Sequence, residues 1–147
     1  MKILIVGLGS IGQRHFKILQ SYSNIQLAAL RTKKGELKNE INIKEFFNLN
    51  DALSFKPDGV IISNPTTYHV ESALPFLKKG CKVLIEKPIS SSDKEAQKLE
   101  PYKDKIRVAY CLRFHPLSDF VLDSIDLNTI YKVNNLHDHF TRSRILP

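Results

Sequence analysis

Residues 1–12 read Met1-Lys-Ile-Leu-Ile-Val-Gly-Leu-Gly-Ser-Ile-Gly12, and this stretch decides the fold. Lys2–Val6 is a short apolar run rich in β-branched residues, which predicts a parallel strand that is buried on both faces. The glycines after it spell G-x-G-x-x-G, and residues 13–20 continue with helical spacing. Strand, glycine turn and helix in this order are the context that a dinucleotide-binding fingerprint requires.

Each glycine of this turn has a distinct expected role. Gly7 permits the tight turn, Gly9 lets the backbone approach a pyrophosphate, and Gly12 lets the helix pack close to the strand. The helix N-terminus then offers free N–H groups and the positive end of its dipole to the phosphates. The alternative is a glycine turn in an unrelated α/β protein. The residues predicted to bind the cofactor here are Gly7, Gly9, Ser10, Ile11 and Gly12.

The composition is that of an ordinary globular domain, with 147 residues, 42% hydrophobic and 25% charged. The net charge of +7 comes with scattered lysines and no interleaved aromatic stripe, so we expect no nucleic-acid partner. Cys81 and Cys111 each lie at the edge of an apolar run, which is typical of small buried thiols in a reducing compartment. We see no leader peptide and no run of membrane-spanning length, and expect a cytoplasmic protein without a membrane partner.

Apolar runs alternate with helical patterns along most of the chain. This alternation predicts an α/β fold, with a doubly wound parallel sheet of the Rossmann type. We predict strands at 2–6, 25–30, 60–63, 81–85 and 106–111, helices at 13–20, 68–79 and 93–102, and a short strand and helix within 41–55. One face of the first helix is expected to pack on the sheet: Ile11, His15, Ile18 and Leu19.

The end of the second strand is where such folds contact the adenosine ribose, about 20 residues past the glycines. An acidic residue there would accept a hydrogen bond from the 2′-hydroxyl of NAD, but none follows the strand until Glu36. Arg31, Thr32 and Lys33 instead offer charge and donors that suit a 2′-phosphate. We therefore expect NADP to be preferred over NAD, while a basic surface turn remains the alternative.

Asn64, Pro65 and Thr66 follow the strand at 60–63, at the carboxyl edge where open α/β sheets bind ligands. We predict that they contact the cofactor, and that Thr66 or Thr67 caps the next helix. His69 falls in the first turn of that helix. Its place favours a cofactor contact, but a lone histidine is as readily a structural residue, and both readings stay open.

Glu86-Lys87-Pro88 ends the strand at 81–85, and Arg113 and His115 follow the strand at 106–111. From the residues alone, Glu86 and Lys87 are as easily an ion pair in a solvated turn. Arg113 and His115 suit either a cofactor or substrate contact or a role in ordering the chain as it leaves the domain. All of them stand at the carboxyl edge of the predicted sheet.

The pattern changes after residue 116. Residues 117–125 suit a helix and 130–140 suit a long strand, so we expect a dinucleotide-binding domain at 1–116 and the start of a second, α+β domain at 117–147. His137 and His139 would share one face of that strand, but two imidazoles make a poor zinc site. We interpret the His137-Asp138-His139 run as a polar sheet face and predict no metal.

Four motifs together resemble the Gfo/Idh/MocA oxidoreductases: Gly7-Leu-Gly-Ser-Ile-Gly-Gln-Arg-His15, Asn64-Pro-Thr-Thr-Tyr-His69, Glu86-Lys-Pro88 and Arg113-Phe-His-Pro116. The resemblance implies hydride transfer between NAD(P) and a ring hydroxyl of a sugar, sugar nucleotide or cyclitol. It implies a catalytic Lys87 whose ammonium hydrogen-bonds the reacting oxygen, with Glu86 holding the lysine or the nicotinamide ribose. It also implies a cis peptide bond between Lys87 and Pro88.

Members of this family are much longer, and their second domain is a large β-sheet that carries substrate contacts and a catalytic histidine. By this resemblance, residues 117–147 are the crossover helix and first strand of an incomplete sheet domain. We expect the full-length protein to be a homo-oligomer through that sheet, and this chain alone to bind cofactor without turnover. A non-catalytic nucleotide-sensing protein is the alternative function. A nucleic-acid-binding regulator would need a reading module, which the sequence does not show.

Overall fold

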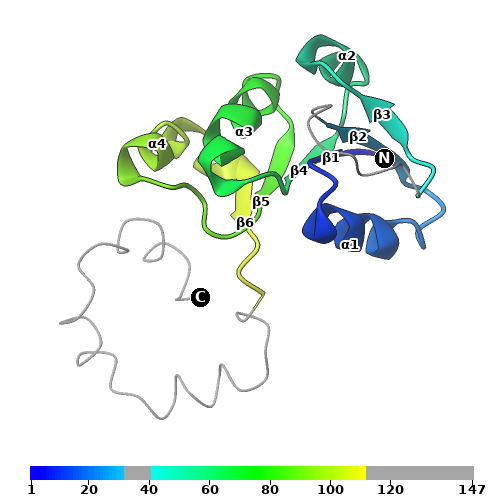
Figure 1. Ribbon diagram of the computed structural model, residues 1–147. Helices are drawn as coiled ribbons and strands as arrows, with labels where there is room; N and C mark the ends of the chain where they lie inside the picture. The colour runs from blue at the N-terminus through cyan, green and yellow to red at the C-terminus, as the bar shows by residue number, and fades with distance from the viewer. Residues whose placement is uncertain (32–40, 112–147) are drawn as a thin grey trace, which may run out of the picture. The chain divides into compact units, whose positions relative to one another are not determined.

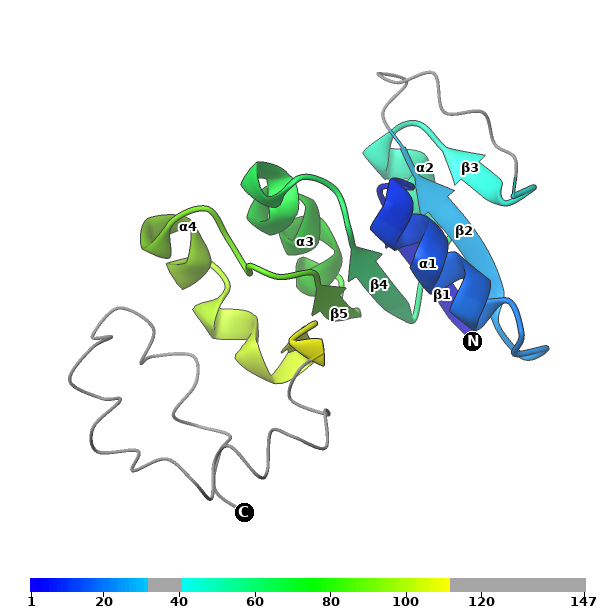
Figure 2. The same cartoon turned by 60° about the horizontal axis from the view of Figure 1, so that its bottom comes forward.

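Six short parallel strands form one sheet in the computed structural model, which describes residues 1–31 and 41–111 (Figure 1). In sheet order they are β3 (Lys44–Phe46), β2 (Gln26–Leu30), β1 (Lys2–Val6), β4 (Gly59–Ile62), β5 (Lys82–Ile85) and β6 (Ile106–Val108). Figure 2 shows this order across the sheet from β3 to β5. The order reverses direction between β1 and β4, which makes their carboxyl ends the switch point where such sheets bind ligands. The predicted doubly wound Rossmann sheet is confirmed.

The central strand β1 is buried on both faces. Leu4 and Ile5 are each 0% exposed, and they pack into two different clusters on opposite sides of the sheet. In the register, Ile5 pairs with Ala29 of β2 on one side and with Ile61 of β4 on the other. A strand with neighbours on both edges and helices on both faces buries both sets of alternating side chains, which explains why apolar residues follow Lys2 without a break to the end of β1.

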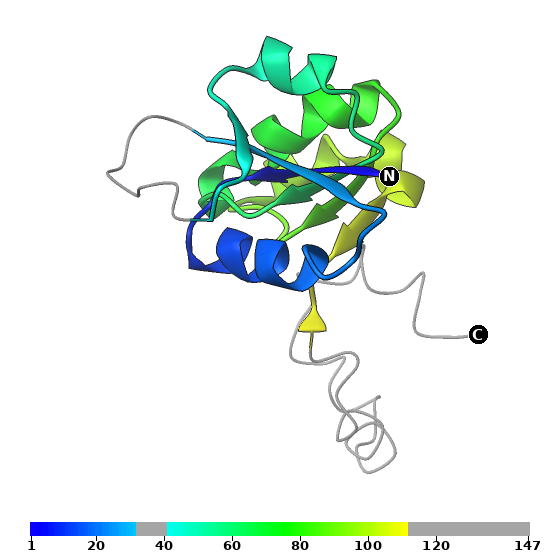
Figure 3. The same ribbon diagram turned by 90° about the vertical axis from the view of Figure 1, so that its right-hand side faces the viewer.

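Helices cover both faces of the sheet. Helix α1 (Ser10–Leu19) lies on one face, and α2 (Leu49–Ser54) and α3 (His69–Lys78) lie on the other (Figure 3). The larger cluster, on the α2 and α3 side, includes Phe76, which is 0% exposed. Within residues 1–31 and 41–111, no helix combines the length and apolar character needed to cross a membrane.

The buried face of α1 differs from the prediction. Gly12 is buried and Phe16 and Leu19 pack on the sheet, whereas Ile11 and Ile18 are 43% and 53% exposed. The reason is steric, because only Gly12 can come close enough to β1, and its neighbours at i+4 and i+7 then face the same way. The packing of Gly12, rather than the spacing of the isoleucines, therefore determines which face of α1 is buried.

One predicted helix is divided in the structure, and one predicted helix cap is absent. The segment 93–102 splits into α4 (Asp93–Gln97) and the 3-10 helix η2 (Glu100–Lys105), because Pro101 lacks the N–H that would continue the α-helix. Ser92 caps α4 and accepts a hydrogen bond from the Glu95 amide at 3.3 Å. The predicted threonine cap of α3 is wrong. A separate 3-10 turn, η1 (Thr66–Tyr68), precedes it, and no side chain caps either element.

The two cysteines lie in different environments. Cys81 is buried, and its thiol donates a hydrogen bond to the Pro57 carbonyl at 3.1 Å. Burial is the main cause that raises the pKa of the Cys81 thiol. Cys111 is exposed, so the expectation that both thiols are buried is wrong for this one. Neither cysteine is in a disulfide.

This difference predicts selective alkylation. At pH 8, iodoacetamide should modify Cys111 at least about tenfold faster than Cys81, because Cys81 is both shielded and poor in reactive thiolate. Peptide mapping by mass spectrometry after short reaction times measures both rates. In urea the two thiols should react at similar rates, and equal rates in the folded chain would contradict the burial of Cys81.

Candidate functional site

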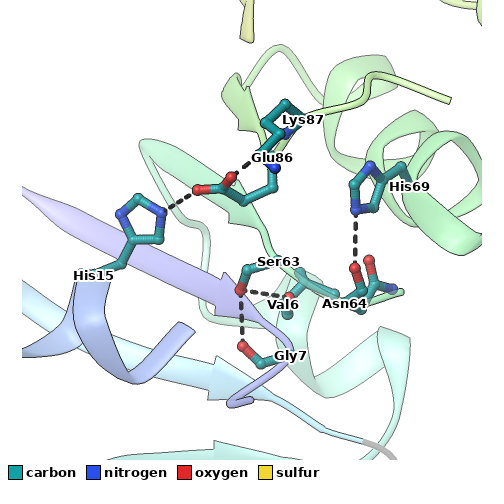
Figure 4. Close-up of polar contacts among 8 residues, drawn as sticks. All are labelled: Val6, Gly7, His15, Ser63, Asn64, His69, Glu86 and Lys87. Atoms are coloured by element: carbon teal, nitrogen blue, oxygen red, sulfur yellow. Dashed lines mark hydrogen bonds and ion pairs between the residues drawn. The ribbon is translucent and has the colours of Figure 1, made fainter. Parts of the chain in front are cut away.

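The loop after β1 is shaped by contacts with the end of β4. Gly7 has φ +91°, and a Cβ at this position would lie 2.8 Å from the Asn64 amide nitrogen. The Ser63 hydroxyl lies 3.1 Å from the Val6 carbonyl and 2.9 Å from the Gly7 carbonyl, and can donate to either (Figure 4). Only glycine fits at position 7, and the loop is thereby fixed at the switch point.

Gly12 and Gly9 have different surroundings, so the lack of a side chain has a different consequence at each position. A Cβ on Gly12 would lie 2.0 Å from the Gly7 carbonyl oxygen, so this glycine is required for helix α1 to pack against the loop. Among the residues that the structure describes, a Cβ on Gly9 would meet no atom within 4 Å. Open space beside this backbone fits the predicted close approach of a pyrophosphate.

The N-terminus of α1 is also free to receive an anion. Gly9 is its N-cap residue, no side-chain hydrogen bond caps this end, and the first turn carries no acidic residue. The first backbone N–H groups of Ser10, Ile11 and Gly12 precede the first intrahelical bond, from the Gln13 amide to the Gly9 carbonyl at 2.9 Å. These donors and the helix dipole suit a phosphate group, so the residues present fit a dinucleotide.

His69 is buried beneath the turns at this edge. It is 2% exposed, with Nδ1 2.9 Å from the Pro88 carbonyl oxygen and Nε2 2.8 Å from the Asn64 carbonyl oxygen. It therefore contacts both the turn after β4 and the turn after β5. Figure 4 shows the contact with Asn64. Of the two readings left open for His69, this geometry supports the structural one, because both ring nitrogens already contact the backbone. A neutral imidazole donates to one carbonyl, and an imidazolium donates to both.

Asn64 presents its side chain to α3 as well. Its amide nitrogen donates to the Ser72 hydroxyl at 2.7 Å. Its Oδ1 is buried and, among the described residues, has no hydrogen-bond partner. A buried acceptor without a donor is costly, so this oxygen marks a place where an additional donor would be favourable. Pro65 and Thr66 follow directly, and Pro65 is exposed.

The Glu86-Lys87-Pro88 turn follows β5. The Glu86 carboxylate accepts a hydrogen bond from His15 Nε2 at 2.8 Å, and its other oxygen accepts a longer one, 3.4 Å, from the Lys87 amide. The Glu86 side chain thus contacts both α1 and the backbone of Lys87. The Lys87–Pro88 peptide bond is cis, as the resemblance predicts. The Lys87 side chain is exposed, and no hydrogen bond or ion pair in the described part of the chain holds its ammonium.

His15 has a role that the sequence analysis missed. It was expected on the buried face of α1, but its side chain instead pairs with Glu86 and is 21% exposed. The spacing in the sequence could have indicated this contact. His15 lies one helical turn after Gly12, and the close packing of Gly12 keeps that part of α1 near the carboxyl edge of the sheet. The pair links α1 to the turn that carries Lys87 (Figure 4).

At the end of β2, Arg31 pairs with a residue that the sequence analysis did not consider. Its guanidinium lies 2.6 Å from the Glu45 carboxylate of β3, and both side chains are 12% exposed. Along the chain, no acidic residue follows β2 until Glu36, whereas Glu45 reaches Arg31 from the neighbouring strand β3. Thr32, Lys33 and Arg113 lie outside the described residues, as do His115 and the His137–His139 run.

In chemical terms, the described residues place at this edge a helix end without a side-chain cap, the exposed ammonium of Lys87 and the guanidinium of Arg31. Within the described ranges, no three His, Cys, Asp or Glu side chains come together in a way that could hold a metal ion. The arrangement suits a cofactor with two phosphates and a reacting oxygen that needs a hydrogen-bond donor.

Comparison with known proteins also identifies a nucleotide-binding Rossmann fold. Residues 1–111 match the family model described as oxidoreductase family, NAD-binding Rossmann fold. The chain is 28% identical over 120 residues to rhizopine catabolism protein MocA of Rhizobium meliloti, covering 76% of this chain and 38% of that protein. It is 30% identical over 105 residues to a scyllo-inositol 2-dehydrogenase (NADP(+)) of Bacillus subtilis, covering 67% of this chain and 32% of that protein.

A similar solved structure is scyllo-inositol dehydrogenase from Lactobacillus casei with bound NAD(H) and scyllo-inositol. It has a TM-score of 0.67 and 27% identity, over 88% of this chain and 42% of that one. The chain thus spans about two-fifths of the length of the relatives it matches. With its family model covering residues 1–111, the chain belongs to the Gfo/Idh/MocA oxidoreductase family.

Proposed function

We propose that this chain is the cofactor-binding part of an NAD(P)-dependent oxidoreductase, which transfers a hydride to or from a ring hydroxyl of a sugar, sugar nucleotide or cyclitol. The observation that carries the proposal is the G-x-G-x-x-G turn at the switch point, with open space beside Gly9 and an uncapped helix end. The names of the relatives support the substrate class, since they include dehydrogenases of inositols and of a nucleotide sugar.

Different residues would bind different parts of the cofactor. Backbone N–H groups of Ser10, Ile11 and Gly12 bind the pyrophosphate, and the turn starting at Asn64 lines the nicotinamide side. At the ribose end, Arg31 favours a 2′-phosphate, because no acidic residue directly follows β2. The remaining proposed contacts are Gly7, Gly9, Thr32, Lys33, Pro65, Thr66, Glu86, Lys87 and Arg113. His69 would act beneath them by fixing the two turns rather than by touching the cofactor.

Lys87 is the proposed catalytic residue. When bound, the nicotinamide cofactor supplies the hydride acceptor or donor. The Lys87 ammonium is exposed at the carboxyl edge, where it can donate a hydrogen bond to the substrate oxygen and stabilise the charge that develops there. Glu86 and His15 hold the backbone that presents it.

The two helix-end glycines give a matched test of the phosphate site. Gly12→Ala should lower the free energy of unfolding by about 3 kcal/mol or more, because its Cβ would overlap the Gly7 carbonyl. Gly9→Ala should cost less than about 1 kcal/mol of stability. It should nevertheless weaken NADPH binding by at least about tenfold, because the methyl group occupies the space of the pyrophosphate.

Urea unfolding and titration of NADPH fluorescence measure the two effects on the same samples. Unchanged NADPH affinity in a folded Gly9→Ala variant would argue against pyrophosphate binding at this turn.

The proposed preference for NADP(H) predicts a selective effect of Arg31. Arg31→Ala should weaken NADPH binding roughly tenfold or more, the value of one charge-assisted contact, and change NADH binding by less than about twofold. Arg107→Ala, on the opposite edge strand β6, removes the same charge and is the control. Calorimetric titrations with both cofactors measure the ratio. The preference is wrong if the unmodified chain binds NADH as tightly as NADPH.

The chain should bind cofactor without turning it over. The phosphate site, Arg31 and Lys87 lie within the described residues, whereas the groups that hold the substrate and move its proton would lie in the remainder of the longer family members. Orientation accounts for about 7–11 kcal/mol of barrier lowering, and an acid or base for a further factor of about 10² to 10⁴. An assay with NADP⁺ and a panel of inositols, aldoses and sugar nucleotides should show no reduction above background. Robust turnover would place the proton-transfer group within this chain.

A further inference from the structure

The Arg31–Glu45 ion pair stands at the position proposed to contact the adenosine ribose. Their closest atoms, Arg31 Nη1 and Glu45 Oε1, are 2.6 Å apart, and each side chain is 12% exposed. Exposed ion pairs are weakly coupled because water screens both charges, whereas a pair as shielded as this one is screened less. The Glu45 carboxylate is therefore an anion that competes with an anionic ligand for the guanidinium of Arg31.

The sheet itself fixes this partnership. Glu45 of β3 pairs in register with Ala29 of β2, and the Arg31 amide donates to the Phe46 carbonyl at 2.9 Å, one residue past the end of β2. Side chains two residues apart on a strand share a face, so Arg31 extends over the same face as Ala29 and Glu45. The carboxylate reaches the guanidinium because the two strands are hydrogen-bonded, without any contribution from a ligand.

We infer that Glu45 is a specificity-determining residue that limits the preference for NADP(H) over NAD(H). The inference rests on the proposed cofactor-binding function and deepens it. A 2′-phosphate at Arg31 would bring a second anion to a guanidinium that already holds a carboxylate, and the two anions repel each other. The 2′-hydroxyl of NAD(H) is uncharged and meets no such repulsion.

Glu45→Gln tests the charge without removing the hydrogen bond. Glutamine keeps an oxygen that can accept from Arg31, so the guanidinium stays oriented while the competing charge is lost. The affinity for NADPH should rise about three- to tenfold, and that for NADH should change by less than about twofold. Glu45→Ala should raise NADPH affinity by less, because it also removes the acceptor that orients Arg31.

Glu95→Gln is the matched control. Glu95 pairs with Lys98 at the same distance, 2.6 Å, in α4 before the opposite edge strand, and its substitution changes the net charge equally. It should leave the affinity for both cofactors unchanged. Calorimetric titrations of the whole chain with NADPH and NADH, together with thermal unfolding of each variant, provide all the required values.

The outcomes separate this inference from the function on which it rests. If the unmodified chain binds neither cofactor, the proposed function fails and the inference fails with it. If the chain binds cofactor but Glu45→Gln leaves the NADPH-to-NADH affinity ratio unchanged, the inference alone is overturned. A lower ratio in both Glu45 variants would show that the carboxylate helps Arg31 to bind the phosphate, which is the opposite role.

Discussion

The close approach of helix α1 to the loop after β1 is the contact on which the rest of the site depends. No side chain fits between Gly12 and the Gly7 carbonyl, where an added Cβ would lie at 2.0 Å. This contact sets which face of α1 is buried and aims the helix N-terminus at the switch point. It also brings His15, one turn further on, within 2.8 Å of Glu86. The absence of a side chain at Gly12 thus influences both the position of the N-terminus of α1 and its contact with the turn that carries Lys87.

Most of the fold could be predicted from the sequence because the strands are buried on both faces. Continuous apolar runs such as Lys2–Val6 have few other stable arrangements than the inside of a parallel sheet. The prediction failed where a local pattern competed with a steric or covalent constraint. Ile18 has the spacing of a buried residue, but it is exposed because the packing of Gly12 determines which face of α1 meets the sheet. Pro101 divides a segment whose composition otherwise suits a single helix.

The site could be predicted only where its residues are neighbours along the chain. The glycine loop is such a segment, and the structure gives Gly9 and Gly12 the surroundings that their proposed roles require. The ion pairs His15–Glu86 and Arg31–Glu45 are different, because each joins two separate elements. Finding Glu45 requires knowing that β3 lies beside β2 and in which register. A search along the sequence after β2 cannot supply that knowledge.

The two bonds of His69 have a mechanical consequence for this edge of the sheet. The Asn64 turn and the Pro88 turn belong to different crossovers, yet each has a carbonyl oxygen within 2.9 Å of a nitrogen of the same imidazole in the first turn of α3. A shift of either turn away from the sheet would lengthen its contact with a ring that the other turn also touches. The two turns are therefore coupled through one buried side chain at the start of α3, and we expect local opening at this edge to involve both turns together.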